Sequence, residues 1–178
     1  MNKSFDYGLL NTQTDPRFAE RKFGRLGTIA KNGCGMIALY NVERAACPET
    51  RFEPYYDARK AIKTNLFGLL GTRPSSIRKI LEPKGFRITD IDPRHPDPNE
   101  THDAVIVLYW FWFGAHYVAG FHREDGAYRM YNYFTEPYAL PLNKFLEILK
   151  NGKNRVVRVW GVDFPPKEGK EDRISSES

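Results

Sequence analysis

The stretch GCGMIALYNVERAACP, residues 33–48 of the 178-residue chain, is the starting point for predicting the fold. It consists mainly of good helix formers, and Met36, Leu39 and Glu43 recur at the three-to-four-residue spacing of one helix face. Pro48 cannot continue a helix. The stretch therefore predicts a mostly buried helix that starts near Cys34 and ends before this proline.

Two more helices and a strand are predicted between this helix and the middle of the chain. Residues 57–70 carry an apolar stripe, and residues 74–82 begin with a proline, which favours the first turn of a helix. Gly85 then turns the chain into residues 86–91, where apolar and polar side chains alternate. This alternation predicts an edge strand.

Strand patterns dominate the second half of the chain. Residues 92–102 contain three prolines and predict a loop. The elements predicted after this loop are strands at 104–111, 116–122, 127–134 and 156–164, a turn at 124–126, and an amphipathic helix at 142–150. Because helices come first and strands mostly follow, the sequence predicts an α+β fold rather than an alternating α/β fold.

Length and composition predict a single domain. With 41% hydrophobic residues, the chain can bury a core without disulfides or a structural metal. Residues 1–164 are expected to form this domain, with 1–32 as an extended lead-in, and the charged tail 165–178 is expected to be disordered. The longest apolar stretch, residues 104–121, is interrupted by glycine and histidine, so it predicts strands and no membrane span.

The ionisable and sulfur-containing residues argue against several classes of function. The chain has 27 Lys and Arg against 22 Asp and Glu, a net charge of +5, but the bases are scattered among acids, which argues against a nucleic-acid partner. There is no Cys-x-x-Cys motif and no histidine pair at helical spacing, so neither a metal nor another cofactor is expected. The first residues do not resemble a secretory signal, so reduced thiols and a cytoplasmic location are expected. The oligomeric state stays open.

Cys34 is the candidate nucleophile. At the start of a helix, unpaired amides and the positive end of the helix dipole favour the thiolate and lower the pKa of a thiol. Gly33 and Gly35 flank this cysteine and are expected to leave room for a substrate main chain. His116 lies on a predicted strand just after Gly114 and is the candidate acid and base.

Asn132 is the candidate for orienting His116. A hairpin turn centred near residue 125 sets residue 116 opposite about residue 134, which makes Asn132 a diagonal neighbour of His116 on one sheet face. A hydrogen bond to the far nitrogen of an imidazole holds the ring in one orientation. We therefore expect the Asn132 side chain to make this bond.

Three segments together resemble the Cys, His and Asn/Asp boxes of papain-like cysteine peptidases. They are GCGMIALYNV from Gly33, GAHYVAGF from Gly114 and RMYNYF from Arg129. The closest likeness is to the compact bacteriocin-processing peptidases that cut double-glycine leaders, and it extends over residues 27–163. The resemblance implies a papain-like fold, with an N-terminal helical half packed on a C-terminal antiparallel sheet. It also implies hydrolysis of a peptide or amide bond in a peptide or protein substrate, through an acyl-enzyme on the cysteine.

The resemblance also implies residue roles. Cys34 corresponds to the nucleophile, His116 to the general base and acid, and Asn132 to the orienting residue. The family usually has a glutamine a few residues before the cysteine, which completes the oxyanion hole, but the matching position is near Thr28 and no glutamine is nearby. Asn32 is the candidate replacement donor, acting with the Cys34 main-chain amide.

Other functions and other residues remain open. The same groups would serve an acyltransferase or a deamidase, and the missing glutamine also suits a catalytically silent binding module. His122 shares a strand face with His116 and is the rival base. Cys47 is expected to be structural, His102 to be solvated, and the aromatic run at 109–113 to form core and cleft wall.

Overall fold

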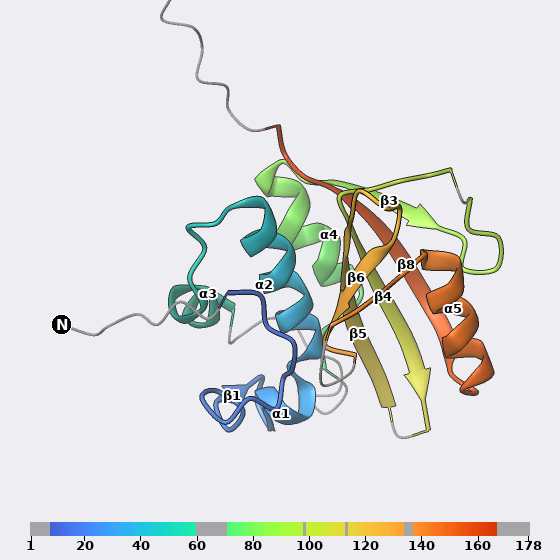
Figure 1. Cartoon of the computed structure of the whole chain (residues 1–178). Helices are drawn as coiled ribbons and strands as arrows, with labels where there is room; N and C mark the ends of the chain where they lie inside the picture. Colours follow the sequence, from blue (N-terminus) through green and yellow to red (C-terminus); the bar gives the residue numbers. More distant parts are fainter. Residues whose placement is uncertain (1–7, 60–70, 98, 113, 134–136, 167–178) are drawn as a thin grey trace, which may run out of the picture.

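The helices precede most of the strands in the computed structural model, which describes residues 8–59, 71–97, 99–112, 114–133 and 137–166 (Figure 1). The helices are α1 (Ile29–Asn32), α2 (Cys34–Ala46), α3 (Phe52–Arg59), α4 (Ser75–Leu81) and α5 (Leu142–Asn151), with a short 3-10 helix at Glu82–Lys84. Helices and an antiparallel sheet thus form the α+β fold that the sequence predicts. No helix in these ranges has both the length and the apolar character needed to cross a membrane.

Six strands form one antiparallel sheet. In the order of the chain they are β3 (Arg87–Ile91), β4 (Ala104–Phe111), β5 (Gly114–His122), β6 (Tyr128–Tyr131), β7 (Tyr138–Leu140) and β8 (Arg155–Asp163). In space the order is β3-β8-β4-β5-β6-β7. The short strands β1 (Lys22–Phe23) and β2 (Gly27–Thr28) pair separately near the N-terminus.

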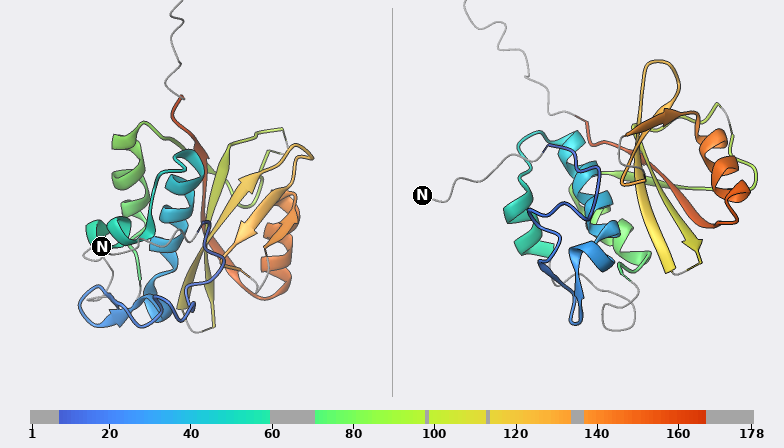
Figure 2. Two further views of the ribbon diagram at one scale, coloured as in Figure 1. Left: turned by 60° about the vertical axis from the view of Figure 1, so that its left-hand side comes forward. Right: turned by 60° about the horizontal axis from the view of Figure 1, so that its bottom comes forward.

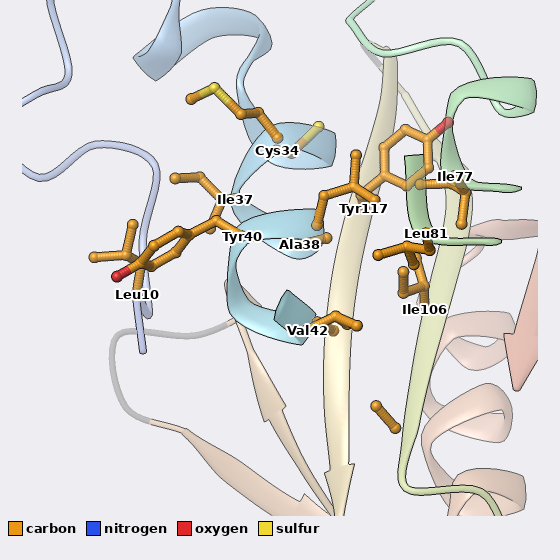
Figure 3. Packing of buried hydrophobic residues seen from close by; sticks show 14 of the residues in the cluster. Leu10, Cys34, Ile37, Ala38, Tyr40, Val42, Ile77, Leu81, Ile106 and Tyr117 are labelled. Atoms are coloured by element: carbon orange, nitrogen blue, oxygen red, sulfur yellow. The ribbon is translucent and has the colours of Figure 1, made fainter. Parts of the chain in front are cut away.

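The sheet carries helices on both faces. Helices α2 and α4 lie on one side and α5 on the other in each view (Figure 2). Side chains alternate along β5, so Tyr117 joins the buried cluster with α2, whereas Val118 joins the cluster with Phe145 of α5. Figure 3 shows Ala38 and Val42 of α2 directed toward the sheet. The sheet therefore divides the core into two layers.

Helix α2 is central to the first layer. Every residue from Cys34 to Glu43 is buried, so the helix is apolar around almost its whole circumference, as expected of a helix enclosed by other elements. The polar exceptions are Asn41 and Glu43. The Glu43 carboxylate accepts a hydrogen bond from the Tyr55 hydroxyl and pairs with Lys84. A buried charge needs such partners to offset its desolvation.

Most elements follow the sequence prediction, but the N-terminal third differs. The expectation of an extended lead-in is wrong, because β1, β2 and α1 form there, and Phe18 and Phe23 are buried in the core. The predicted helix at 57–70 falls mostly on residues outside the described ranges, as does most of the predicted tail. Strand β7 was not predicted.

Candidate functional site

Cys34 is the first residue of α2. Gly33 ends α1 and also caps α2, so the chain passes from one helix to the next at this residue. Cys34 is only 4% exposed and belongs to the core layer between α2 and the sheet. The predicted position at a helix N-terminus is confirmed, but the thiol lies inside the protein.

The pKa of Cys34 is raised to about 11 because burial disfavours the thiolate. The main-chain amides of Tyr117, Gly35 and Cys34 itself act in the opposite direction, but their effect is smaller. The expectation of a lowered pKa is therefore wrong, since desolvation outweighs the favourable field of the helix end. The resting thiol is protonated at neutral pH.

The glycines beside Cys34 do not provide space for a substrate. A Cβ on Gly33 would lie 2.6 Å from the carbonyl oxygen of Ile29, and one on Gly35 would lie 2.6 Å from the hydroxyl of buried Thr72. Both glycines thus allow close packing of neighbouring chain. This corrects the expectation that they leave room for a substrate main chain.

His116 lies on β5 opposite Tyr109 of β4, and its ring meets the rings of Tyr109 and Phe111 edge-on. Its Nε2 is 2.6 Å from the carbonyl oxygen of Asn132. A carbonyl only accepts, so Nε2 carries the proton in the neutral ring and Nδ1 is left as an acceptor. Burial lowers the pKa of His116, and the bond to Asn132 opposes this to a lesser degree. The ring is therefore neutral and able to take a proton at Nδ1 at neutral pH.

Asn132 holds His116 through its main chain. The β5–β6 hairpin pairs Ala119 with Tyr131 and His122 with Tyr128, which is the predicted register. Asn132 follows the end of β6 and has a φ of 63°, a left-handed conformation that asparagine tolerates better than most residues. Its carbonyl then points at His116. The expected side-chain bond to His116 is replaced by this main-chain bond.

The Asn132 side chain has other partners. Its Nδ2 donates to the Tyr117 carbonyl over 3.3 Å, and its Oδ1 accepts from the Gln13 main-chain N–H over 3.1 Å. Strand β6 no longer pairs with β5 beside Tyr117, so this amide takes the place of a strand partner. The side chain thus fixes residue 132 against β5.

Cys34, His116 and Asn132 all interact with the same short length of β5. The Cys34 thiol interacts with the amide of Tyr117, the residue next to His116, and Asn132 bonds the carbonyl of Tyr117. Among the residues described, however, no hydrogen bond joins the thiol to the His116 ring, and the neighbouring ring of Tyr109 belongs to the core layer on the α5 side. The thiol therefore contacts the residue next to His116 but is not bonded to the His116 ring at rest.

A hollow of about 540 Å³ opens beside His116. Apart from His116, its lining consists of uncharged residues: Asn11, Thr12, Gln13, Thr14, Asn132 and Tyr133. Because His116 is also neutral at neutral pH, the hollow suits an uncharged polar group such as a peptide unit better than a charged one.

Gln13 is the residue of this region that the sequence did not single out. It is the only glutamine in the chain. Its Nε2 donates to the Ala30 carbonyl over 2.6 Å, and its Oε1 lies 3.5 Å from the Asn132 amide nitrogen. No local pattern pointed to it, because its partner Asn132 is 119 positions away.

Asn32, the candidate oxyanion donor, is half-buried at the end of α1. Its side-chain nitrogen packs against Gly27, where any Cβ would collide with it. The side chain is thus directed to Gly27, the first residue of β2. Its role in an oxyanion hole stays a prediction.

The remaining histidines differ in their surroundings. His122, the rival base, is exposed, and its ring packs edge-on against Tyr128. His102 is only 7% exposed, with Nδ1 2.9 Å from Asp163 and Nε2 3.1 Å from Glu100. The expectation that His102 is solvated is wrong, because two carboxylates accommodate its ring inside the protein.

The other thiol and the aromatic run also have clear positions. Cys47 is exposed and donates to Glu49 over 3.3 Å. Tyr109 is buried as expected, but Trp110 and Phe111 are partly exposed and Trp112 is 91% exposed. The aromatic run therefore leaves the core at the end of β4, close to His116, instead of forming core throughout.

Within the described residues, no group of three or more His, Cys, Asp or Glu side chains is arranged to hold a metal ion.

Comparison with known proteins does not assign the chain to a family. No protein-family model and no curated protein sequence matches it.

Proposed function

We propose that the chain is a thiol-dependent hydrolase of papain-like fold, which cleaves a peptide or other amide bond through an acyl-enzyme on Cys34. The observation that carries this proposal is the state of His116. Its Nε2 is held by the Asn132 carbonyl, its Nδ1 is left as a base, and the next residue in the chain contacts the Cys34 thiol. The uncharged hollow beside His116 supports an amide as the substrate group.

The proposed reaction starts from two neutral groups. When substrate binds, the Cys34 thiol turns from the Tyr117 amide toward Nδ1 of His116 and gives up its proton as sulfur attacks the carbonyl carbon. The oxyanion accepts a hydrogen bond from the Cys34 main-chain amide and, once the Asn32 side chain has turned away from Gly27, a second one from Asn32. The carbon–nitrogen bond breaks, and His116 protonates the leaving amine. His116 then takes a proton from water, which hydrolyses the thioester and frees the thiol.

The acyl-enzyme provides the direct test of this proposal. In the Cys47→Ala variant, Cys34 is the only thiol, and p-nitrophenyl acetate is a small acyl donor that can report its reaction. We expect acetylation of Cys34, detected by peptide mass mapping, together with repeated release of p-nitrophenol and acetate. A Cys34 that is never acetylated would contradict the proposal and favour the silent binding module.

The same experiment separates hydrolysis from acyl transfer. With an added amine such as glycinamide, a hydrolase still releases acetate as its main product, because water is the acceptor. If acetyl glycinamide predominates at millimolar amine, the chain is an acyltransferase on the same acyl-enzyme. Mass spectrometry of the small products measures this ratio.

The rate of acylation is expected to rise once as pH increases and then to stay level. Below its pKa, His116 is protonated and cannot accept the thiol proton, so the rate rises as pH passes through a pKa below the ordinary 6.5. The rate then stays level to at least pH 9, because Cys34 keeps its proton up to about 11. Initial rates between pH 4 and 10 check this. A fall near pH 8 would instead indicate a preformed thiolate–imidazolium pair.

A further inference from the structure

The N-terminal strap, residues 8–14, joins the two sides of the candidate site. Its first part is fixed to α2: the Tyr40 hydroxyl donates to the Gly8 carbonyl, and the buried Asn41 side chain exchanges two hydrogen bonds with the main chain of Leu10, of 2.7 and 2.8 Å. The strap is therefore held in place before it reaches the hollow beside His116.

The second part of the strap surrounds Asn132. The Asn11 side chain accepts from the Asn132 main-chain N–H over 3.3 Å, and the Gln13 main-chain N–H donates to Asn132 Oδ1. The Gln13 side-chain oxygen faces the Asn132 side-chain nitrogen at 3.5 Å. These contacts engage both the main chain and the side chain of a residue in a left-handed conformation. The conformation of Asn132 is thus set by residues at the far end of the sequence.

Gln13 also reaches the side of the site that carries the thiol. Its Nε2 donates to the carbonyl of Ala30 in α1, and α1 leads through Gly33 directly into Cys34. One side chain therefore contacts both the helical segment before the nucleophile and the residue whose carbonyl holds the base.

We propose that Gln13 is a positioning residue that sets the placement of His116 relative to Cys34 by bridging α1 and Asn132. The proposal rests on the proposed function, since it assigns a role within that reaction. If the bridge is lost, Asn132 keeps its other bonds but is no longer tied to α1. Its carbonyl then holds Nε2 less firmly, and the His116 ring samples both neutral tautomers.

The variant Gln13→Met tests the bridge. It keeps the side-chain length and the main-chain N–H but removes both polar side-chain contacts. We expect ¹⁵N NMR of the imidazole to show a dominant Nε2–H tautomer in the unaltered protein and a mixture of tautomers in the variant. Turnover of p-nitrophenyl acetate is expected to fall in kcat by about 10- to 100-fold, with KM changed less than about threefold. Glu20→Gln, an exposed change on the same N-terminal segment, is the matched control and is expected to alter neither property.

A second variant covers the possibility that Gln13→Met does not fold. Asn132→Gly can adopt the left-handed conformation without strain but lacks the side chain that Gln13 contacts. Because glycine is equally free to leave this conformation, the variant is expected to give the same mixture of tautomers. In the unaltered protein, slow hydrogen exchange of the Gln13 main-chain N–H reports the bond to Asn132 without any substitution. Fast exchange of this N–H would overturn the proposal.

The tautomer measurement does not depend on turnover, so failure of the inference can be told from failure of the proposed function. If the folded Gln13→Met protein keeps the unaltered tautomer and kcat, the bridge has no positioning role, whether or not the chain is a hydrolase. If the tautomers mix but the unaltered protein acylates nothing, the bridge stands as a structural device and the hydrolase proposal falls.

Discussion

Replacing Cys34 by alanine is expected to lower kcat/KM for an acyl substrate by about four orders of magnitude or more, while replacing Cys47 by alanine leaves it unchanged. Without the sulfur there is no acyl-enzyme, and the remaining groups can only assist attack by water. Cys47 is exposed on the far end of α2 and contacts none of the residues around His116 among its described contacts. Steady-state release of p-nitrophenol from p-nitrophenyl acetate, corrected for the spontaneous rate, measures both variants.

The comparison of the two cysteine variants has a built-in control for folding. Cys34 is buried in the core, and alanine at this site removes one sulfur atom, so thermal unfolding of Cys34→Ala is followed alongside activity. A variant that stays folded and retains more than a tenth of the original turnover would rule out Cys34 as the nucleophile. Loss of turnover in Cys47→Ala would assign the reaction to the other thiol.

Replacing His116 by glutamine is expected to lower turnover about 10³-fold at pH 7 and to change its pH dependence. Glutamine can still donate to the Asn132 carbonyl, so the local main chain is maintained, but it cannot accept the thiol proton. Attack then requires the thiolate that is already present. Because the pKa of Cys34 is about 11, the residual rate should rise tenfold for each pH unit between 7 and 10. Rates in this range measure the slope.

The matched control for this change is His122→Gln, on the same strand but exposed. It is expected to keep both the rate and the level profile of the unaltered protein. If His122→Gln, and not His116→Gln, abolishes turnover, the rival base is the correct one. If the residual rate of His116→Gln does not depend on pH, proton transfer from Cys34 does not limit the reaction.

The parts of the site that the sequence predicted depend on local patterns. The start of α2 follows from helix formers after Gly33, and the turn at 124–126 sets the register of β5 against β6. Both signals lie within a few residues of what they determine. They were sufficient to place Asn132 beside β5 near His116.

The parts that the sequence did not predict depend on distant contacts. The pKa of Cys34 is decided by the sheet packed over it, which outweighs the local field of the helix end. His102 is a second example. The composition of the segment predicts a loop and a solvated ring, but the ring is buried between carboxylates from two segments. Gln13 has no distinguishing neighbours in the sequence. Burial and long-range pairing are properties of the folded chain, which neighbouring residues do not encode.

The bridge between Gln13 and Asn132 has a consequence for the order of events during synthesis. Its hydrogen bonds join positions 119 residues apart, and contacts of such separation are among the last to form as a chain emerges and folds. Until residue 132 has been made and has met the strap, Cys34 exists without an oriented base. A nascent or partly folded chain therefore carries the thiol in an unassisted form, and the proposed hydrolase gains activity only with its completed fold.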